Sequence, residues 1–262
     1  MVKKQITMKT FKINNIIIVF TFFILLLIIA CEKDTEYEEL SGQLIGYVTL
    51  YDSDRTKLSD NSGVEIIVEG SNPQLKTSTD ENGQFVIDNL KSGIYNIILN
   101  KESYCQHKLV SYQFVGGNKP ATIYQTALYS QSNLQIDSLK ITDLESKYFV
   151  EFMVNAKVSN QNSTSYCRYY LSNKPDISFE NYITTDIVYN FSGNKDISFY
   201  LQIDTLKYPI GSELYLIMYP ASEKNQYYTD INTGNIIYTS ININKPSKVA
   251  NITIPEVETP WW

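Results

Sequence analysis

Side chains that commonly act as nucleophiles or general bases are scarce in this sequence. Its 262 residues include one histidine, His107, and three cysteines. Cys105 lies two positions before His107, so on a strand both side chains would lie on one face, as a nucleophile and its base would need. A Ser-His-Asp triad or a zinc hydrolase site needs a third group, and the sequence suggests none beside His107. We therefore expect a strand residue at a domain edge and predict no catalytic residue and no enzyme activity.

The other catalytic signatures are missing or unspecific. The sequence has no phosphate-binding glycine loop, dinucleotide-binding fingerprint or G-x-S-x-G elbow. A glycosidase needs only two carboxylates at the right separation in space, and no such pair is singled out, so a glycan hydrolase is kept as the least favoured alternative. We expect no cofactor.

Acidic and amide residues gather in the loop DSDRTKLSDNSG, residues 52–63, and a second turn begins like an EF-hand at Asp80. An EF-hand requires glycine at its sixth position and glutamate at its twelfth. Counted from Asp80, this chain has Phe85 and Lys91 there. We therefore expect ordinary turns and no metal site. A loosely held structural ion at the first two aspartates of the loop is the alternative.

The N-terminal segment predicts export. Four lysines and no acidic residue precede an apolar run from Ile16 to Ala30, which only Thr21 interrupts. This run of 15 residues is shorter than the roughly 18 expected of a membrane-spanning helix. A basic head, an apolar run and a small residue before the cut are typical of a secretory signal peptide, which we assign to residues 1–30.

The end of this signal, Ile28-Ile29-Ala30-Cys31, resembles the bacterial lipobox. The resemblance implies that Cys31 carries lipid and is the first residue of the mature protein, which is then anchored to the membrane without spanning it. An uncleaved single-pass anchor, with Cys31 an ordinary cysteine, is the alternative.

Residues 31–40 form an acidic tether with five acidic side chains against Lys33. Such a charged segment is expected to be extended and solvated. A cysteine followed by Lys, Asp and Glu also resembles the export signal of Bacteroidetes-type lipoproteins, which implies display on the outside of the outer membrane. Retention in the periplasm is the alternative.

The charge of the mature chain excludes polyanionic partners. Without residues 1–30 it has 18 basic and 28 acidic side chains, a formal charge of −10. Its only arginines are Arg55 and Arg168, so we expect no nucleic-acid partner and no binding to an anionic lipid surface. We expect Cys105 and Cys167 to be buried thiols, with an interdomain disulfide as the alternative.

Apolar residues alternate with polar ones through residues 41–130, which predicts an all-β domain of short strands. Asn82-Gly83 predicts a tight hairpin turn between two of them. Seven strands separated by turn signals predict a β-sandwich, with apolar runs at 44–51, 64–68, 85–87, 94–99, 108–114 and 121–129 among them.

The order of motifs in this domain resembles that of the carboxypeptidase regulatory-like domain, a transthyretin-like β-sandwich. The motifs are G-x-V-x-L-Y-D from Gly46, GVEIIVEG from Gly63, TDENGQF from Thr79, SGIY from Ser92 and KESY from Lys101. The resemblance covers residues 41–130 and implies a fold but no activity, because the chain has no room for a zinc carboxypeptidase domain.

A polar linker, SQSN, leads into a second predicted sandwich over residues 133–262, so the expected architecture is two tandem β-sandwich domains. This part resembles a fibronectin type III or immunoglobulin-like domain. Tyr166 and Tyr170 alternate with Cys167, Tyr169 and Leu171, so tyrosine is expected on both faces of that strand. The predicted strands begin at Leu134 and continue at 148–158, 166–171, 182–191, 197–203, 214–219, 236–243 and 249–254.

Tyrosine is the one compositional excess, with 21 residues. Tyrosines pack on strands and also form glycan or protein contact surfaces. The only tryptophans, Trp261 and Trp262, lie in the C-terminal tail, which counts against a dedicated glycan module. Asp137-Ser138-Leu139 and Asp204-Thr205-Leu206 resemble a short bacterial O-glycosylation acceptor, which makes Ser138 and Thr205 candidate modification sites.

We therefore expect a non-catalytic surface lipoprotein that acts as a binding or accessory module in the capture of a glycan or protein nutrient. Its partners would be the membrane, through the lipid on Cys31, and a surface protein or glycan. A fimbrial-type subunit or adhesin is the alternative. In fimbrial lipoproteins with two transthyretin-like domains, cleavage after an arginine opens a groove for a donor strand, and Arg55 follows the first predicted strand.

Overall fold

The structure is a computed structural model that describes residues 40–160, 165–190 and 195–258. The predicted signal peptide, Cys31 and nearly all of the predicted tether lie outside these ranges, as do Trp261 and Trp262. All regular elements of the described residues are strands, which confirms the all-β class. Accordingly, this part of the chain has no helix long and apolar enough to cross a membrane.

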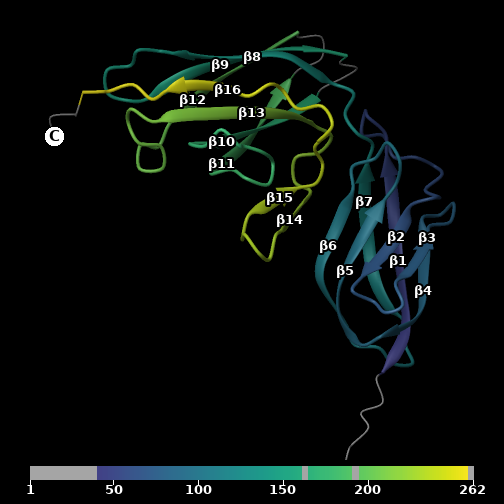
Figure 1. The fold of residues 1–262 in the computed structure, drawn as a ribbon. Helices are drawn as coiled ribbons and strands as arrows, with labels where there is room; N and C mark the ends of the chain where they lie inside the picture. The colour runs from purple at the N-terminus through teal and green to yellow at the C-terminus, as the bar shows by residue number, and fades with distance from the viewer. Residues whose placement is uncertain (1–39, 161–164, 191–194, 259–262) are drawn as a thin grey trace, which may run out of the picture. The chain divides into compact units, whose positions relative to one another are not determined.

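Residues 41–129 form a sandwich of two sheets (Figure 1). One sheet has the strand order β4-β1-β7 and the other β3-β2-β5-β6. Apolar side chains from both sheets, among them Leu44, Ile66, Ile97 and Leu128, form the shared core. The strands are β1 (Ser41–Tyr51), β2 (Glu65–Glu69), β3 (Leu75–Ser78), β4 (Gln84–Lys91), β5 (Gly93–Asn100), β6 (His107–Phe114) and β7 (Ala121–Tyr129).

The turn at Asn82-Gly83 closes tightly, with Gly83 N donating to Asp80 O and Asp80 N donating to Gln84 O, but it does not join two paired strands as the predicted hairpin would. Strands β3 and β4, which it separates, belong to different sheets. Gly83 alone of the two residues has a positive φ, of 82°, whereas a tight hairpin turn of this type needs two. The peptide instead lies against β1, where Val48 N donates to Gly83 O at 2.8 Å. The glycine is needed because a Cβ there would come within 2.0 Å of Val48 O.

The second sandwich consists of the sheets β12-β9-β8 and β11-β10-β13-β16, with a separate two-stranded ribbon, β14-β15. Leu134, Phe152, Leu201 and Leu214 contribute to the core between its sheets. The strands are β8 (Gln135–Asp143), β9 (Glu151–Ser159), β10 (Ser165–Ser172), β11 (Thr184–Asn190), β12 (Asp196–Gln202), β13 (Glu213–Ala221), β14 (Tyr227–Thr229), β15 (Ile236–Tyr238) and β16 (Ala250–Thr253).

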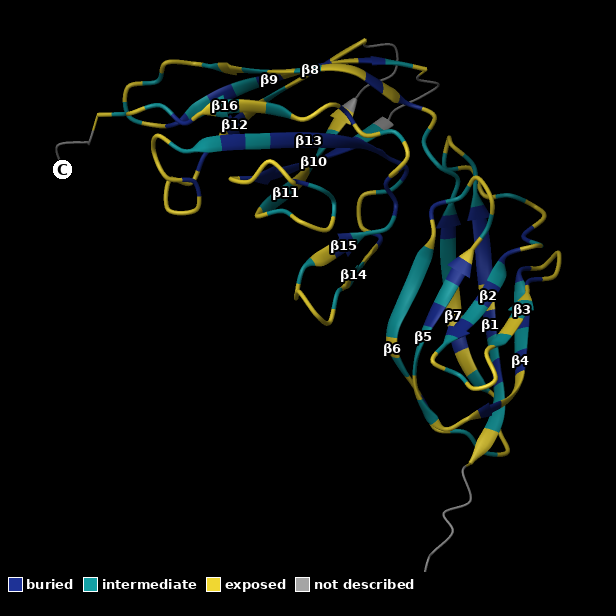
Figure 2. Ribbon diagram, in the orientation of Figure 1, coloured by how far each residue is buried: buried dark blue, intermediate teal, exposed yellow. Residues whose placement is uncertain are grey.

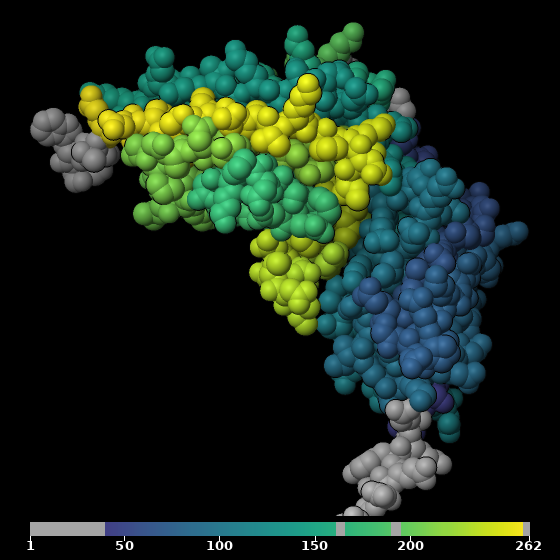
Figure 3. Space-filling model, in the orientation of Figure 1, coloured from purple at the N-terminus to yellow at the C-terminus, as the bar shows by residue number. Residues whose placement is uncertain are grey.

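Two predictions in this sandwich are wrong in detail. The strand expected at 236–243 ends at Tyr238, since the following residues are held by single contacts such as Asn242 N to Pro220 O. The partner strand β14 was not predicted, because YYT is too short to show alternation. These two strands form a ribbon that stands out from the second sandwich in Figures 1 and 3.

Strand β13 is buried on both faces, and it is dark blue along most of its length in Figure 2. Leu216 and Met218 belong to the core between the sheets. Ile217 and Tyr219 belong to a second apolar cluster on the outer face of the sheet. Tyr170 of β10 belongs to that outer cluster as well, so tyrosine does occupy both faces of β10 as expected.

Candidate binding groove

The predicted linker, residues 130–133, is held by hydrogen bonds from the second sandwich. Ser222 Oγ donates to Ser130 O at 2.6 Å, and Asn242 Nδ2 donates to Ser132 O at 3.0 Å. Further along the same face, Gln226 Nε2 donates to Ala127 O on β7 at 2.6 Å. The segment that leads into β14 is therefore bonded directly to an edge strand of the first sandwich.

Strands β6 and β7 are the last strands of their respective sheets. Each contains a β-bulge. Tyr95 of β5 pairs with Tyr112 of β6, and Ile97 pairs with Leu109, so a step of two residues on β5 corresponds to three on β6. Ser111, within this bulge, has a φ of 55°. Strand β7 likewise advances three residues, past Tyr124, while β1 advances two. Bulges bend a strand and redirect its side chains, and they are common next to functional sites.

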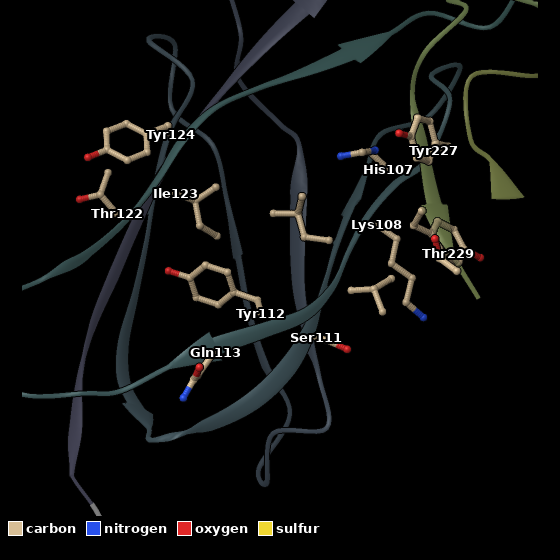
Figure 4. A pocket seen from close by; sticks show the side chains of 13 residues that line it. His107, Lys108, Ser111, Tyr112, Gln113, Thr122, Ile123, Tyr124, Tyr227 and Thr229 are labelled. Atoms are coloured by element: carbon tan, nitrogen blue, oxygen red, sulfur yellow. The ribbon is translucent and has the colours of Figure 1, made fainter. Parts of the chain in front are cut away.

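An open groove of about 800 Å³ lies along these two bulged strands (Figure 4). Figure 4 shows Tyr124 and Tyr112 on one side of the view, with Ile123 between them, and Tyr227 with His107 on the other side. The groove volume falls in the range of ligand-binding clefts. Its lining comes from β6, β7 and β14, as residues 107–113, 122–124 and 227–229.

Four tyrosines give the groove its apolar surface. Tyr124 is 85% exposed and Tyr227 is 51% exposed, so their rings are open to a ligand. Tyr112 and Tyr228 are half-buried, and burial raises the pKa of both phenols above its ordinary value. Each of the four rings presents an aromatic surface with a hydroxyl at its rim.

The groove carries no uncompensated charge among its lining residues. Lys108 is the one lysine or arginine of the lining, and its Nζ lies 2.8 Å from Glu69 Oε2. Lys108 and then Asn96 lower the pKa of Glu69, because both donate hydrogen bonds to the carboxylate. Asn96 Oδ1 in turn accepts from Ser111 N at 3.0 Å. These contacts connect Ser111 in the β6 bulge, through Asn96, to Glu69 on β2 and so fix the bulge.

Cys105 and His107, the one nucleophile–base pair considered from the sequence and not favoured, are in unreactive forms. Burial lowers the pKa of His107 to about 4, and its Nδ1 lies 3.5 Å from Thr239 Oγ1. Burial raises the pKa of Cys105 to about 11, so it is a thiol whose Sγ lies 3.8 Å from Ser222 Oγ. Cys105 and His107 therefore contact different residues of the second sandwich and do not form a nucleophile–base pair.

Cys105 and Cys167 are both buried free thiols. Cys167 lies in the core of the second sandwich, whereas Cys105 contacts Ser222. The default expectation of two buried thiols therefore holds in the structure, and the alternative disulfide is not formed.

In the loop of residues 52–63 and in the turn at Asp80, side-chain oxygens accept hydrogen bonds from nearby backbone N–H groups. Asp52 Oδ1 accepts from Asp54 N at 2.9 Å and from Thr56 N at 2.8 Å. Asn61 Oδ1 accepts from Leu50 N, and Asp80 Oδ1 accepts from Gln84 N. These are the side-chain contacts of turns. In the described ranges no three His, Cys, Asp or Glu residues are grouped as a metal site requires.

The remaining predicted sites lie away from the groove. Ser138 is exposed at a bulge of β8, and Thr205 is exposed in the turn that follows β12. Arg55 follows β1, as the fimbrial alternative requires, and its guanidinium lies over the ring of Tyr166, 4.4 Å from the centroid. However, β1 is the central strand of its sheet, so cleavage at Arg55 would free the strand that carries Leu44 and Leu50 of the core.

Sequence reasoning did not identify the groove itself. The excess of tyrosine and the single His107 are visible in the sequence, but nothing in its pattern distinguishes Tyr124 or Tyr227 from the other tyrosines. Tyr124 lies in the run ATIYQTALY, and the departure from alternation there, with Tyr124 and Gln125 both exposed, is the one local sign of the bulge.

No protein-family model and no curated protein matches this chain. Among solved structures, a proposed carbohydrate-binding protein from Bacteroides uniformis has 9% identity and a TM-score of 0.31, with 82% of this chain and 100% of that chain covered. A DUF3823 family protein from Bacteroides ovatus has 9% identity and a TM-score of 0.33, with 81% and 98% covered.

A cohesin–X-dockerin complex from Acetivibrio cellulolyticus is also similar, with 16% identity, a TM-score of 0.30 and 34% of this chain covered. The match spans 58% of the length of that chain. With identities and TM-scores this low, function has to be argued from the groove itself.

Proposed function

We propose that this chain is a non-catalytic lipoprotein of the outer membrane, anchored by lipid on Cys31 and facing outward, that captures a glycan in the groove of β6, β7 and β14. The observation that carries the ligand assignment is the combination of two exposed rings, Tyr124 and Tyr227, with a polar lining whose one lysine, Lys108, is paired with Glu69. Sugars present apolar ring faces and hydroxyl groups together, and this lining can contact both. The aromatic surface of the groove consists of tyrosine, and none of the residues that line it is a tryptophan.

The bulges favour a glycan over an extended peptide. A peptide that adds to a sheet edge needs a regular row of main-chain donors and acceptors. Both edge strands that line the groove are interrupted where they line it, at Ser111 and at Tyr124. Bulges of this kind are one way in which proteins block strand addition.

Titration calorimetry with purified protein and a panel of soluble glycans tests the assignment. Tyr124→Ala and Tyr227→Ala should each weaken binding roughly tenfold, because an aromatic contact contributes about 1–1.5 kcal/mol. Tyr200→Ala is the matched control, since Tyr200 is 75% exposed on β12 and does not line the groove. Equal losses in all three variants, or no glycan bound by folded protein, would contradict the proposal.

The anchor is tested separately. Intact mass of the mature protein should begin at Cys31 and include the mass of attached acyl chains, and Cys31→Ala should abolish membrane retention. Protease treatment of whole cells should degrade the protein if it faces outward. An unacylated product that keeps its apolar leader would refute lipid anchoring without affecting the groove assignment.

A further inference from the structure

A second hollow of about 420 Å³ adjoins the groove. The two share His107 and Tyr227 in their linings, so Tyr227 stands between them. The other residues of the hollow come from β7 and from the segment that leads into β14: Gln125, Thr126, Ala127, Tyr129, Glu223, Asn225 and Gln226.

One hydrogen-bond acceptor among the lining residues of the hollow has no partner in the described part of the chain. Gln226 Nε2 is committed to Ala127 O, and Gln125 Nε2 is committed to Thr49 Oγ1. Since a carbonyl oxygen can only accept, the Gln226 amide must keep its nitrogen toward Ala127. Its Oε1 is buried and has no hydrogen-bond partner in the described part of the chain. A buried acceptor without a partner is costly, and a donor from a ligand would offset that cost.

Among the residues that line the hollow, the charged side chain is that of Glu223. Glu223 is the one carboxylate of the combined lining, and its Oε1 accepts from Lys224 N at 2.7 Å. Beside it, the pKa of Tyr129 is raised, first by burial and then by the charge of Glu223, while the charge of Arg55 lowers it less. An anionic ligand would be repelled here, whereas hydroxyl groups could donate to the carboxylate and the amide oxygens.

We infer that the groove and the hollow together bind one uncharged oligosaccharide chain, which continues past Tyr227 from the tyrosine-lined groove into the hollow. This inference rests on the proposed function and specifies its ligand class. Sugar rings contact the tyrosines of the groove, and hydroxyl groups donate in the hollow. Acidic oligosaccharides are selected against, because Glu223 repels them and Lys108 of the groove is already paired with Glu69.

Calorimetry with neutral cello-, manno- and xylo-oligosaccharides of two and six units, and with a six-unit oligogalacturonate, tests the inference. For the neutral series that binds, six units should bind about tenfold tighter than two. Asn225→Ala removes one side-chain amide from the lining of the hollow and should reduce that gain. Asn225 is exposed, so a folded variant is expected, and thermal melting checks it.

Glu223→Gln separates charge from shape. It should weaken neutral six-unit binding by about two- to fivefold, because a charged acceptor becomes a neutral one, and raise oligogalacturonate affinity at least fivefold. Equal affinity for two and six units, with Tyr124→Ala still harmful, would confine the ligand to the groove and overturn the inference while the proposed function stands. Tighter binding of oligogalacturonate than of neutral chains by the unaltered protein would overturn the uncharged class. Absence of binding to every glycan would overturn both.

Discussion

Gln226 donates a hydrogen bond from Nε2 to the main-chain oxygen of Ala127 at 2.6 Å, which ties the segment before β14 to the edge strand β7. The next residue, Tyr227, is part of the groove wall. The position of an aromatic ring in the binding groove therefore depends on a buried amide next to it in sequence. Gln226 is 8% exposed, so water cannot readily replace this bond.

Gln226→Glu should destabilise the protein by about 1–3 kcal/mol, because a buried carboxylate cannot donate to Ala127 O and leaves that oxygen unpaired. Urea unfolding measures the change. Asn225→Asp is the matched control, since it adds a negative charge at the adjacent exposed position and should shift stability by less than about 0.5 kcal/mol. Similar losses in both variants would indicate a charge effect and not a lost hydrogen bond.

Arg168→Lys should destabilise the protein more than Arg168→Met. Arg168 is 4% exposed, its guanidinium carbon lies 3.3 Å from the ring centroid of Tyr238 on β15, and Nη2 donates to Lys224 O at 2.7 Å. No carboxylate pairs with it in the described ranges. Lysine keeps a buried charge but loses the planar stack, whereas methionine removes both.

Hydrogen exchange at β14 and β15 should therefore be faster in Arg168→Lys, and the midpoint of urea unfolding should be lower by an amount that corresponds to about 1–3 kcal/mol. The opposite order of the two variants would show that the charge itself stabilises the site.

Stability should fall as the pH is lowered from about 6.5 to 4. Burial lowers the pKa of His107 to about 4 in the folded protein, while the unfolded chain titrates near 6.5. Within that window the unfolded state binds a proton that the folded state does not, so unfolding is favoured by up to about 3 kcal/mol. Above 6.5 this group has no effect, and below 4 it adds nothing further.

His107→Gln should remove that part of the pH dependence, measured as the difference between variant and unaltered protein in urea unfolding at pH 4, 5.5 and 7.5. The carboxyls of Glu69 and Glu213, whose pKa values are lowered by hydrogen bonds, lose stabilisation at lower pH and are common to both proteins. Parallel stability curves for the two would refute the assignment to His107.

Gly83→Ala should be more destabilising than Gly234→Ala. Both glycines have positive φ, of 82° and 73°, which costs an alanine about 1–2 kcal/mol. Only at Gly83 would the added Cβ also meet the main chain, 2.0 Å from Val48 O. Gly234 has nothing within 4 Å of that position. Thermal melting should show an additional loss of about 1–3 kcal/mol at Gly83, and equal losses would mean that β1 shifts freely.

The strands themselves were largely predictable from the sequence. Strand β9 lies almost wholly within the predicted strand 148–158, and its alternating apolar residues Phe152, Val154 and Ala156 are all buried in one core. The apolar residues Leu134, Ile136, Leu139 and Ile141 change from even to odd positions after Ile136, and β8 has a register shift there, between Ile136 and Ser138. Alternation is a local property of a strand with one buried face, so it is visible without knowledge of the partner strand.

The pairing of those strands was harder to predict from the sequence. Asn82-Gly83 has the composition of a hairpin turn, yet the chain passes there from one sheet to the other. The reason is that Gly83 packs against β1, which is more than 30 residues earlier in the sequence. Turn chemistry describes four residues and contains no information about such a contact.

Alternation, composition and the N-terminal pattern were therefore sufficient for an all-β chain with few catalytic groups, because each of these is a property of neighbouring residues. The groove depended on tertiary structure. Ser111 and Tyr124 lie on separate sheets and Tyr227 lies about a hundred residues beyond Tyr124. Only the bulged edges of β6 and β7, together with the bond from Gln226 to Ala127, bring these residues to one surface, since edge geometry is set by packing between sheets and not by local sequence.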